Sequence, residues 1–148
     1  MLNQLRDVFA SLQKHEVKYV VIGGIAAVLH GVPRATFDLD ILIEATAENV
    51  QRLLDAFIEA KLGTATMTSS DDVLAHDVTI FNDRVRIDVQ TKTLGIAFED
   101  VWLRRKTVSY HKQSFFILSL SDLITSKRAA GRPKDLDDIR ALEDGENL

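Results

Sequence analysis

Two aspartates, Asp38 and Asp40, are separated by a single leucine and begin a stretch in which apolar and polar residues alternate. The alternation predicts a strand, and residues two apart on a strand point to the same face, so the two carboxylates share a face. Asp88 lies in a second alternating stretch, on the side opposite its apolar neighbours. If the two strands pair in the right register, three carboxylates converge.

Such a cluster needs a positive or neutralising partner. Two bare carboxylates about 4 Å apart repel by about 4 kcal/mol at an effective dielectric near 20. A proton, an arginine or a metal ion would relieve this repulsion. Among metals, hard oxygen ligands with open positions suit Mg²⁺, which shares its coordination shell with substrate phosphates. Two such ions can stabilise the attacking and leaving oxygens of an in-line phosphoryl displacement.

A pair of glycines, Gly23-Gly24, lies between a predicted strand and a predicted short helix. Without side chains, their backbone N–H groups and the helix dipole can meet a phosphate. Alone, a diglycine often marks only a tight turn, and an Asp-x-Asp on a strand often only a solvated face. The order and spacing of all these features together indicate phosphate chemistry.

From Val20 to Glu44, with Asp88 further on, the sequence resembles the DNA polymerase β-type nucleotidyltransferase superfamily. The signature of that superfamily is a Gly-Gly or Gly-Ser turn, a short helix, Asp-x-Asp on the next strand and a third acid on a following strand. The version here is similar to the minimal nucleotidyltransferases of the AbiEii type from toxin–antitoxin loci. The stretch from Leu123 to Asp138 also resembles the C-terminal helices of that type.

The sequence is also similar to the head of tRNA CCA-adding enzymes, with two differences. The arginine that follows the glycine turn in those enzymes is replaced here by Ala26-Ala27. The helical domains that hold tRNA are not expected in this chain, so we do not expect CCA addition itself. The serine of many Gly-Ser turns is a glycine here.

The resemblance implies roles for individual residues. Asp38 and Asp40 would bind two Mg²⁺ ions, with Mn²⁺ as the alternative metal, and Asp88 would complete one metal site and orient or deprotonate the attacking hydroxyl. Gly23 and Gly24 would hold the nucleotide phosphates. Lys127 would place a cation on the triphosphate.

Other residues near these sites have two interpretations each. Arg34 and Thr36 either contact phosphate or serve the fold, Arg34 by pairing with an acid. Arg86 shares the predicted face of Asp88, and we expect it to neutralise that carboxylate. Asp135 and Asp138 (with Lys134) either form a surface network or brace Lys127. We expect structural roles for His30, His76 and Trp102.

The implied activity is metal-dependent transfer of an NMP from an NTP to a hydroxyl of an RNA, such as tRNA, or of a protein, with release of pyrophosphate. A cognate toxin or antitoxin protein is the further partner. One alternative is an antitoxin or regulatory module of the same fold that works by binding a partner protein. A second alternative is a small-molecule, antibiotic-modifying nucleotidyltransferase, which ranks last because few acids beyond the three are available to hold an amino sugar.

The periodicity predicts an α+β fold with a small mixed sheet flanked by helices, as in the palm of polymerase β-type nucleotidyltransferases. The helices are expected at 3–14, 25–29, 97–105, 119–130 and from Pro133, with a further helix capped by Thr46 and followed by Gly63. The strands are expected at 18–22, 38–44 (half-buried), 73–81, 84–90, 107–110 and 114–118, and a loop at 64–72. We expect one domain over 1–148, with the helices of 119–143 packed on it.

Composition excludes several classes of protein. The 148 residues are 46% hydrophobic and 27% charged and contain no cysteine, which rules out a disulfide framework, a thiolate zinc site and a cysteine nucleophile. The longest apolar run, Tyr19 to Leu29, is far short of the roughly 20 residues of a membrane span. Without a signal sequence, a cytoplasmic location with no membrane partner is expected.

Charge is uneven along the chain. The net charge is −4, yet residues 104–134 contain eight basic residues and one acidic residue. This segment predicts either a localised site for an anion, such as a triphosphate or an RNA backbone, or a solvated helix face.

Overall fold

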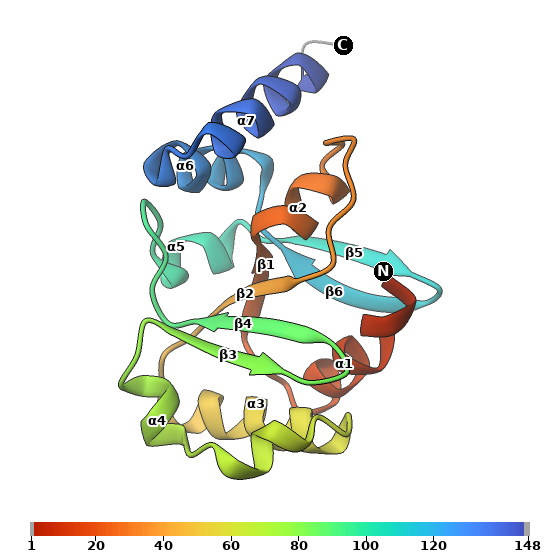
Figure 1. The fold of residues 1–148 in the computed structure, drawn as a ribbon, viewed down its shortest axis with the longest axis vertical. Coiled ribbons are helices and arrows are strands. Elements are labelled where there is room, and N and C mark those ends of the chain that lie inside the picture. Colours follow the sequence, from red (N-terminus) through yellow and green to blue (C-terminus); the bar gives the residue numbers. More distant parts are fainter. Residues whose placement is uncertain (1, 147–148) are drawn as a thin grey trace.

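The computed structural model describes residues 2–146, which form a six-stranded sheet and seven α-helices (Figure 1). The strands are β1 (Tyr19–Ile22), β2 (Leu39–Ile43), β3 (Val78–Asn82), β4 (Arg86–Gln90), β5 (Lys106–Tyr110) and β6 (Gln113–Ile117). The α-helices are α1 (Leu2–Lys14), α2 (Gly23–Leu29), α3 (Ala47–Glu59), α4 (Ser70–Leu74), α5 (Phe98–Leu103), α6 (Leu120–Ala130) and α7 (Pro133–Glu146), and a short 3₁₀ helix, η1, covers Gly63–Met67. The predicted α+β class is confirmed.

The sheet is mixed, with the strand order β3-β4-β2-β1-β6-β5. β1 runs antiparallel to β2, whereas β2 and β4 are parallel, as are β1 and β6. The two hairpins, β3–β4 and β5–β6, therefore lie at opposite ends of the sheet. This order places the two aspartate-bearing strands next to each other.

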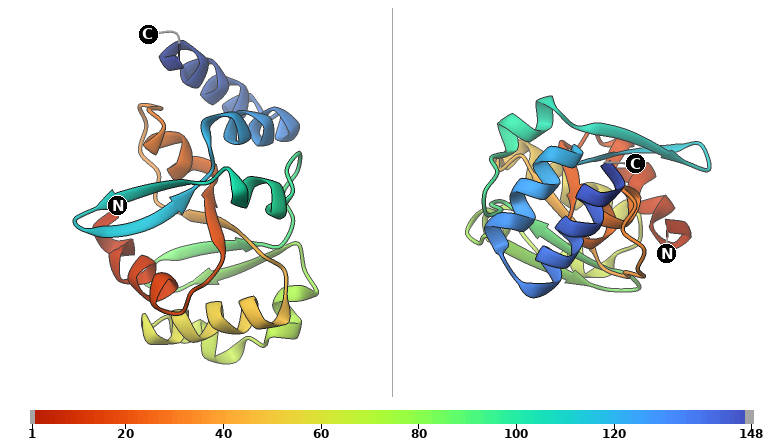
Figure 2. Two further views of the ribbon diagram at one scale, coloured as in Figure 1. Left: turned by 180° about the vertical axis from the view of Figure 1, so that it is seen from behind. Right: turned by 90° about the horizontal axis from the view of Figure 1, so that it is seen from above.

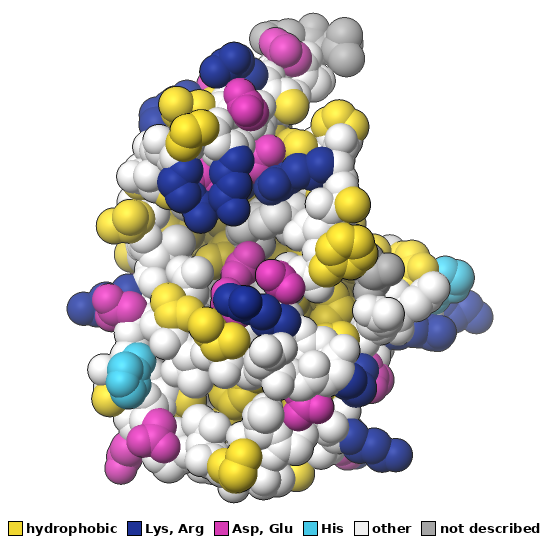
Figure 3. Space-filling model, viewed as in Figure 1, with side chains coloured by type: hydrophobic (Ala, Val, Ile, Leu, Met, Phe, Trp, Pro, Cys, Tyr) yellow, Lys and Arg dark blue, Asp and Glu magenta, His cyan; other side chains and the backbone are white. Residues whose placement is uncertain are grey.

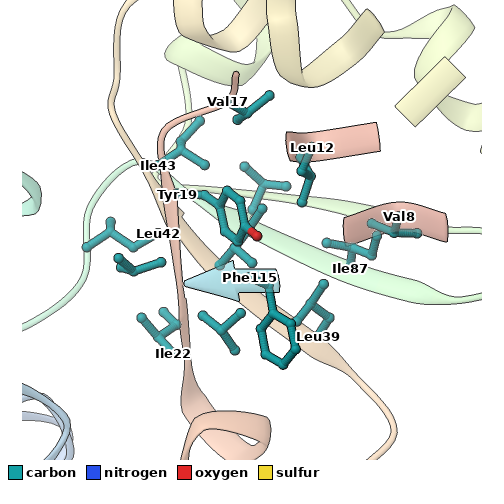
Figure 4. Packing of buried hydrophobic residues seen from close by; sticks show 14 of the residues in the cluster. Val8, Leu12, Val17, Tyr19, Ile22, Leu39, Leu42, Ile43, Ile87 and Phe115 are labelled. Carbon is teal, nitrogen blue, oxygen red and sulfur yellow. The ribbon is translucent and has the colours of Figure 1, made fainter. Parts of the chain in front are cut away.

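Helices lie on both sides of the sheet. Figures 1 and 2 show α1, α3 and α4 on one side and α2, α5, α6 and α7 on the other. Apolar side chains from α1 and from β1, β2, β4 and β6 pack into one cluster between these layers (Figure 4). Among the described residues, no helix is long and apolar enough to cross a membrane.

Several local predictions are confirmed. Thr46 caps α3 by accepting a hydrogen bond from the backbone N–H of Asn49, and Ser119 caps α6 in the same way. Gly131 ends α6 with a φ of 64°, and Pro133 opens α7 at its first position.

Two predictions between α3 and β3 are wrong. Residues 64–72 are not a loop, because η1 and the start of α4 lie there, and the strand expected from Val73 begins only at Val78. The missed signal is a capping box, in which Ser69 and Asp72 each accept a hydrogen bond from the other's backbone N–H. The residue that turns the chain after α3 is Lys61, with a φ of 64°, rather than Gly63.

β2 is more buried than the predicted half-buried strand. Every residue of β2 except Asp40 is buried, because the strand lies in the middle of the sheet with helices on both sides. Asp40 is therefore a lone carboxylate in an apolar strand.

Asn49 connects α3 to the sheet through its side chain, which is 2% exposed. Its Oδ1 accepts from the backbone N–H of Lys18 at 2.8 Å, and its Nδ2 donates to the carbonyls of Lys18 and Glu44 at 3.0 and 2.9 Å. These bonds satisfy backbone groups at the ends of β1 and β2.

We expect Asn49→Ala to lower the free energy of unfolding by about 1–3 kcal/mol, because it leaves the partly buried N–H of Lys18 and carbonyl of Glu44 without their side-chain partner. Urea unfolding measures this loss. Gln51→Ala, on the exposed face of the same helix, is the control and should change stability by less than about 0.5 kcal/mol. Equal effects of the two substitutions would contradict the role given to Asn49.

Candidate active site

A row of paired residues crosses the middle of the sheet. Ile22 of β1 lies opposite Asp40 of β2, Asp40 opposite Asp88 of β4, and Asp88 opposite Ile80 of β3. Residues paired in this way point to the same face, and neighbouring strands are about 4.8 Å apart. The register therefore sets Asp40 and Asp88 side by side, as the sequence pattern required.

A cavity of about 620 Å³ lies over this row, between the sheet and the helices α6 and α7. Every site residue predicted from the sequence lines it: Gly23, Gly24, Arg34, Thr36, Asp38, Asp40, Asp88 and Lys127. Figure 3 shows acidic side chains at the centre of this face, with a row of Lys and Arg side chains below α6 and α7. The cavity thus has an acidic floor and a basic wall.

Asp40 is electrostatically crowded. Burial, followed by the charges of Asp88 and Asp38, raises its pKa from 3.8 to about 6, while Arg86 acts in the opposite direction. The ionised carboxylate is therefore destabilised, and a proton below about pH 6, or a cation at higher pH, relieves this destabilisation.

Arg86 neutralises Asp88, as predicted. Its Nε lies 3.0 Å from Oδ1 of Asp88, and a guanidinium NH₂ lies 3.4 Å from Oδ2. The Arg86 side chain is 43% exposed, so this contact is a surface ion pair, weakened by competition with water and salt. A stronger cation can displace it.

The two glycines allow close approach of the 34–40 segment. Gly23 has a φ of 67°, and a Cβ there would lie 2.5 Å from Oδ2 of Asp40. A Cβ on Gly24 would lie 2.9 Å from Oγ1 of Thr36 and 3.4 Å from the Arg34 guanidinium. The diglycine therefore leaves bare backbone beside the carboxylates and beside Thr36.

Lys127, which the resemblance implies would contact the triphosphate, is buried and paired with carboxylates. Its Nζ lies 2.8 Å from Asp138 and 3.7 Å from Asp135. Asp138 also accepts from Arg34 at 2.8 Å, and Asp135 accepts from the Nε of Arg132 at 2.7 Å. We call these five residues the α6–α7 charge cluster.

The charge cluster carries one surplus positive charge at the basic wall. Burial raises the pKa of Asp135, but the hydrogen bonds from Arg132 and the charges of Arg132 and Lys127 together outweigh burial and hold that pKa below its usual value. The side chain of Arg132 is exposed, whereas that of Lys127 is buried. Arg132 is therefore the cluster's most accessible cation, and Asp135 and Asp138 brace Lys127, which is one of the two interpretations of the sequence.

The sequence analysis missed several cavity residues. Gln90, Lys92, Thr93 and Arg132 also line the cavity. Gln90 could have been found, because it is two residues beyond Asp88 on the same strand face. Arg132 lies between two helices, and only the packing of α7 on α6 brings it to the site.

The remaining candidate residues have structural contacts. A ring nitrogen of His30 hydrogen-bonds to the carbonyl of Leu118 at 2.8 Å, and one of His76 to the carbonyl of Asp72 at 2.7 Å. Trp102 packs between Phe98 and Phe116, with the Arg105 guanidinium over its ring. None of these three side chains lines the cavity among the described residues.

The three aspartates suit Mg²⁺ by the chemistry of their donors, since all are hard oxygen ligands on one cavity floor. Among the described residues, however, no group of three acidic or histidine side chains is already gathered tightly enough to hold a metal ion. Asp88 points its oxygens at Arg86 instead. Binding of an ion by all three aspartates therefore requires Asp88 to exchange Arg86 for the ion.

Comparison with known proteins agrees with the fold. Residues 2–143 match the family described as "Nucleotidyltransferase of unknown function (DUF6036)". The chain belongs to this nucleotidyltransferase family. No curated protein matches the DUF6036 chain.

A solved structure also resembles the DUF6036 protein. It is a presumed nucleotidyltransferase from Thermotoga maritima, determined at 1.87 Å resolution. The two share 18% sequence identity and superpose with a TM-score of 0.61 over 97% of this chain and 92% of that chain. At this level of identity the likeness concerns the fold alone.

The crowding of Asp40 predicts a pH-dependent penalty on the stability of the metal-free DUF6036 protein. The raised pKa means that the folded state binds the Asp40 proton more tightly than the unfolded state does. Proton binding therefore contributes to the stability of the folded state below about pH 4, and this contribution is lost as the pH rises through about 6. At pH 8, Asp40→Asn should therefore be more stable than the wild type by about 2–3 kcal/mol, and at pH 4 the two should be nearly equal.

Urea unfolding in the presence of a chelator at both pH values measures this difference. Asp55→Asn, on the exposed face of α3, is the control and should change stability by less than about 0.5 kcal/mol at either pH. An equal effect of Asp40→Asn on stability at pH 4 and pH 8 would contradict the raised pKa of Asp40.

Close packing of Gly23 against Asp40 predicts a second effect. Gly23→Ala should lower the free energy of unfolding by about 1–3 kcal/mol more than Gly131→Ala. Both glycines have left-handed φ angles, 67° and 64°, but the nearest atom to a Cβ on Gly131 is 3.6 Å away. Comparing the two variants by urea unfolding thus separates the steric clash with Asp40 from backbone strain. Equal losses of stability in the two variants would show that Asp40 moves aside freely.

Proposed function

We propose that this DUF6036 protein is a Mg²⁺-dependent enzyme that transfers an NMP from an NTP to a hydroxyl group and releases pyrophosphate. The observation that supports this most is the pairing of Asp40 with Asp88 across two parallel strands, with Asp38 on the same cavity floor. The diglycine on one side and the basic wall opposite supply the surroundings that a triphosphate needs.

The triphosphate would lie along Gly23, Gly24 and Thr36, where the bare backbone borders the cavity. Arg34 and Arg132 would contact its oxygens from the basic wall. Lys127 would act in the same wall through the α6–α7 charge cluster, because its charge compensates the carboxylates that orient Arg34 and Arg132. Cations fixed before the substrate arrives stabilise charge that develops on the phosphates at little reorganisation cost.

Asp38, Asp40 and Asp88 would hold the metal. When bound, Mg²⁺ would neutralise phosphate charge and favour ionisation of the attacking hydroxyl. Asp88 would accept the proton of that hydroxyl, directly or through a water molecule, after Arg86 has released it. Its position beside Asp40 in the row makes it the acid farthest from the diglycine and closest to an incoming acceptor.

The AbiEii-type subtype and a role in a toxin–antitoxin pair belong to the same proposal. The subtype is supported by the resemblance of residues 123–138 to the C-terminal helices of that type, and these helices bring Lys127 and Asp135 to the wall of the cavity. The pair between Arg34 and Asp138 also supports the expectation that residues 119–143 belong to one domain with the preceding chain.

The competing function is a binding module of the same fold that has no transfer activity. The observation in its favour is the contact of both oxygens of Asp88 with Arg86, which occupies one of the three ligands. The two functions differ in whether pyrophosphate is released.

The test supplies each of the four α-labelled NTPs, Mg²⁺ and a mixture of RNA and protein acceptors. Transfer and pyrophosphate release are expected, and removal of Mg²⁺ by a chelator should abolish both. Asp38→Asn and Asp88→Asn should each lower the rate by about 100- to 1,000-fold, because each removes a metal ligand worth several kcal/mol in the transition state.

Asp55→Asn is the matched control, since it makes the same chemical change on the far side of the sheet. Absence of pyrophosphate release with every NTP and acceptor, together with tight binding of a partner protein, would favour the binding module. Unchanged transfer rates in both aspartate variants would show that the three-carboxylate site takes no part in the reaction.

A further inference from the structure

The geometry of an in-line transfer locates the acceptor on this molecule. In such a reaction the attacking oxygen enters opposite the leaving pyrophosphate. If the triphosphate lies beside Gly23 and Gly24, the attack comes from the other end of the row that runs from Ile22 through Asp40 and Asp88 to Ile80. The acceptor hydroxyl must therefore approach over β4 and β3.

Large apolar side chains are exposed on the surface at that side. Val78, Ile80 and Leu94 are 44%, 53% and 68% exposed. Val78 and Ile80 lie on the face of β3 that carries the site, and both Val78 and Leu94 line the cavity. We call these three residues the acceptor ledge; three large apolar side chains exposed around one site suggest contact with a partner.

A second hollow, of about 520 Å³, continues the cavity past the ledge. It shares Lys92, Thr93 and Leu94 with the cavity and is also lined by Asp77 and Glu99, both exposed. A chain lying on the ledge can therefore place a neighbouring side chain into an acidic hollow.

Charge on this side disfavours a polynucleotide. Among the residues that line the second hollow, Asp77 and Glu99 are acidic and Lys92 is basic, a net charge of −1. Arg86, at the edge of the cavity, is already paired with Asp88. Nucleic acid backbones bind where lysines and arginines neutralise phosphates. The basic residues of this protein are concentrated instead in 104–134, which include the wall on the nucleotide side.

Base stacking is also missing on this side. Proteins that hold single-stranded RNA ends usually stack the bases on exposed aromatic rings. Among the large apolar side chains that are exposed in residues 2–146, the one aromatic ring is that of Phe37, which precedes Asp38 in the chain and lines neither the cavity nor the second hollow.

We infer that the acceptor is a polypeptide, modified on a side-chain hydroxyl that is flanked by apolar residues and by a basic residue. This inference rests on the proposed function. The acceptor oxygen forms a bond to the α-phosphorus of the NTP, and the bond from that phosphorus to the oxygen bridging to the β-phosphate breaks. Pyrophosphate leaves with the bridging oxygen and its electron pair, and the hydroxyl proton passes to Asp88 or to water.

The experiment compares three acceptors under identical conditions with α-labelled NTPs and Mg²⁺. Two are short peptides with a central serine or tyrosine between leucines, one carrying arginines and the other glutamates at its ends. The third is total tRNA. The arginine peptide should be labelled at least about tenfold faster than the glutamate peptide, because like charges across an interface are strongly unfavourable.

Charge reversal tests which residues determine the preference for the arginine peptide. The double variant Asp77→Lys with Glu99→Lys should reduce the preference for the arginine peptide by at least about tenfold. Glu48→Lys with Asp55→Lys makes the same charge change on exposed positions of α3, across the sheet, and should leave the preference unchanged. Ile80→Ser should raise the KM for the peptide without changing the KM for the NTP.

Each outcome decides the inference. Labelling of tRNA without labelling of either peptide overturns it and leaves nucleotidyl transfer standing. Equal labelling of the two peptides, or equal effects of the two double variants, also overturns it. Absence of any labelled product and of pyrophosphate release removes the inference and the proposed function together.

Discussion

Repulsion between Asp40 and Asp88 is the constraint around which the cavity is organised. The register of β2 against β4 places both carboxylates on one face, and burial in the middle of the sheet weakens the solvation that would otherwise screen them. Positive charge surrounds the two carboxylates: Arg86 contacts Asp88 directly, and the pKa of Arg132 is raised mainly by its hydrogen bond to Asp135, with a smaller contribution from the charge of Asp40. A metal ion that also binds phosphates would compensate the negative charge of the two carboxylates more completely. The repulsion between Asp40 and Asp88 is thus the feature that the proposed function would use.

The basic wall depends on an ion network that folding brings together from distant parts of the chain. Arg34 follows α2 and Lys127 lies in α6; Asp138 of α7 joins these two cations, and Asp135 of α7 joins Lys127 to Arg132. Removing one member of such a buried network leaves an uncompensated charge, so its members depend on each other. In consequence, the C-terminal helices are connected through Arg34 to the loop that leads into β2, and their packing determines where the exposed cations of the wall lie.

The two ends of the cavity differ in chemistry. At the diglycine end, bare backbone and cations from α6 and α7 surround the floor. At the β3 end, exposed aliphatic side chains border a hollow lined by Asp77 and Glu99. This division would suit the proposed reaction, which takes two unlike substrates.

The residues of the site and most elements around them follow from local sequence. Alternation predicted the strand that carries Asp40 and that Asp38 directly precedes, and capping residues such as Thr46 and Gly131 fixed helix ends, because these effects act over a few residues. The short helices between α3 and β3 were missed, since a polar capping box gives little periodicity. Only the tertiary structure decided the register that joins Asp40 to Asp88, the burial of Lys127 between two carboxylates, and the aliphatic surface beyond Asp88. Each of these depends on contacts between segments far apart in the chain, whose geometry no local pattern records.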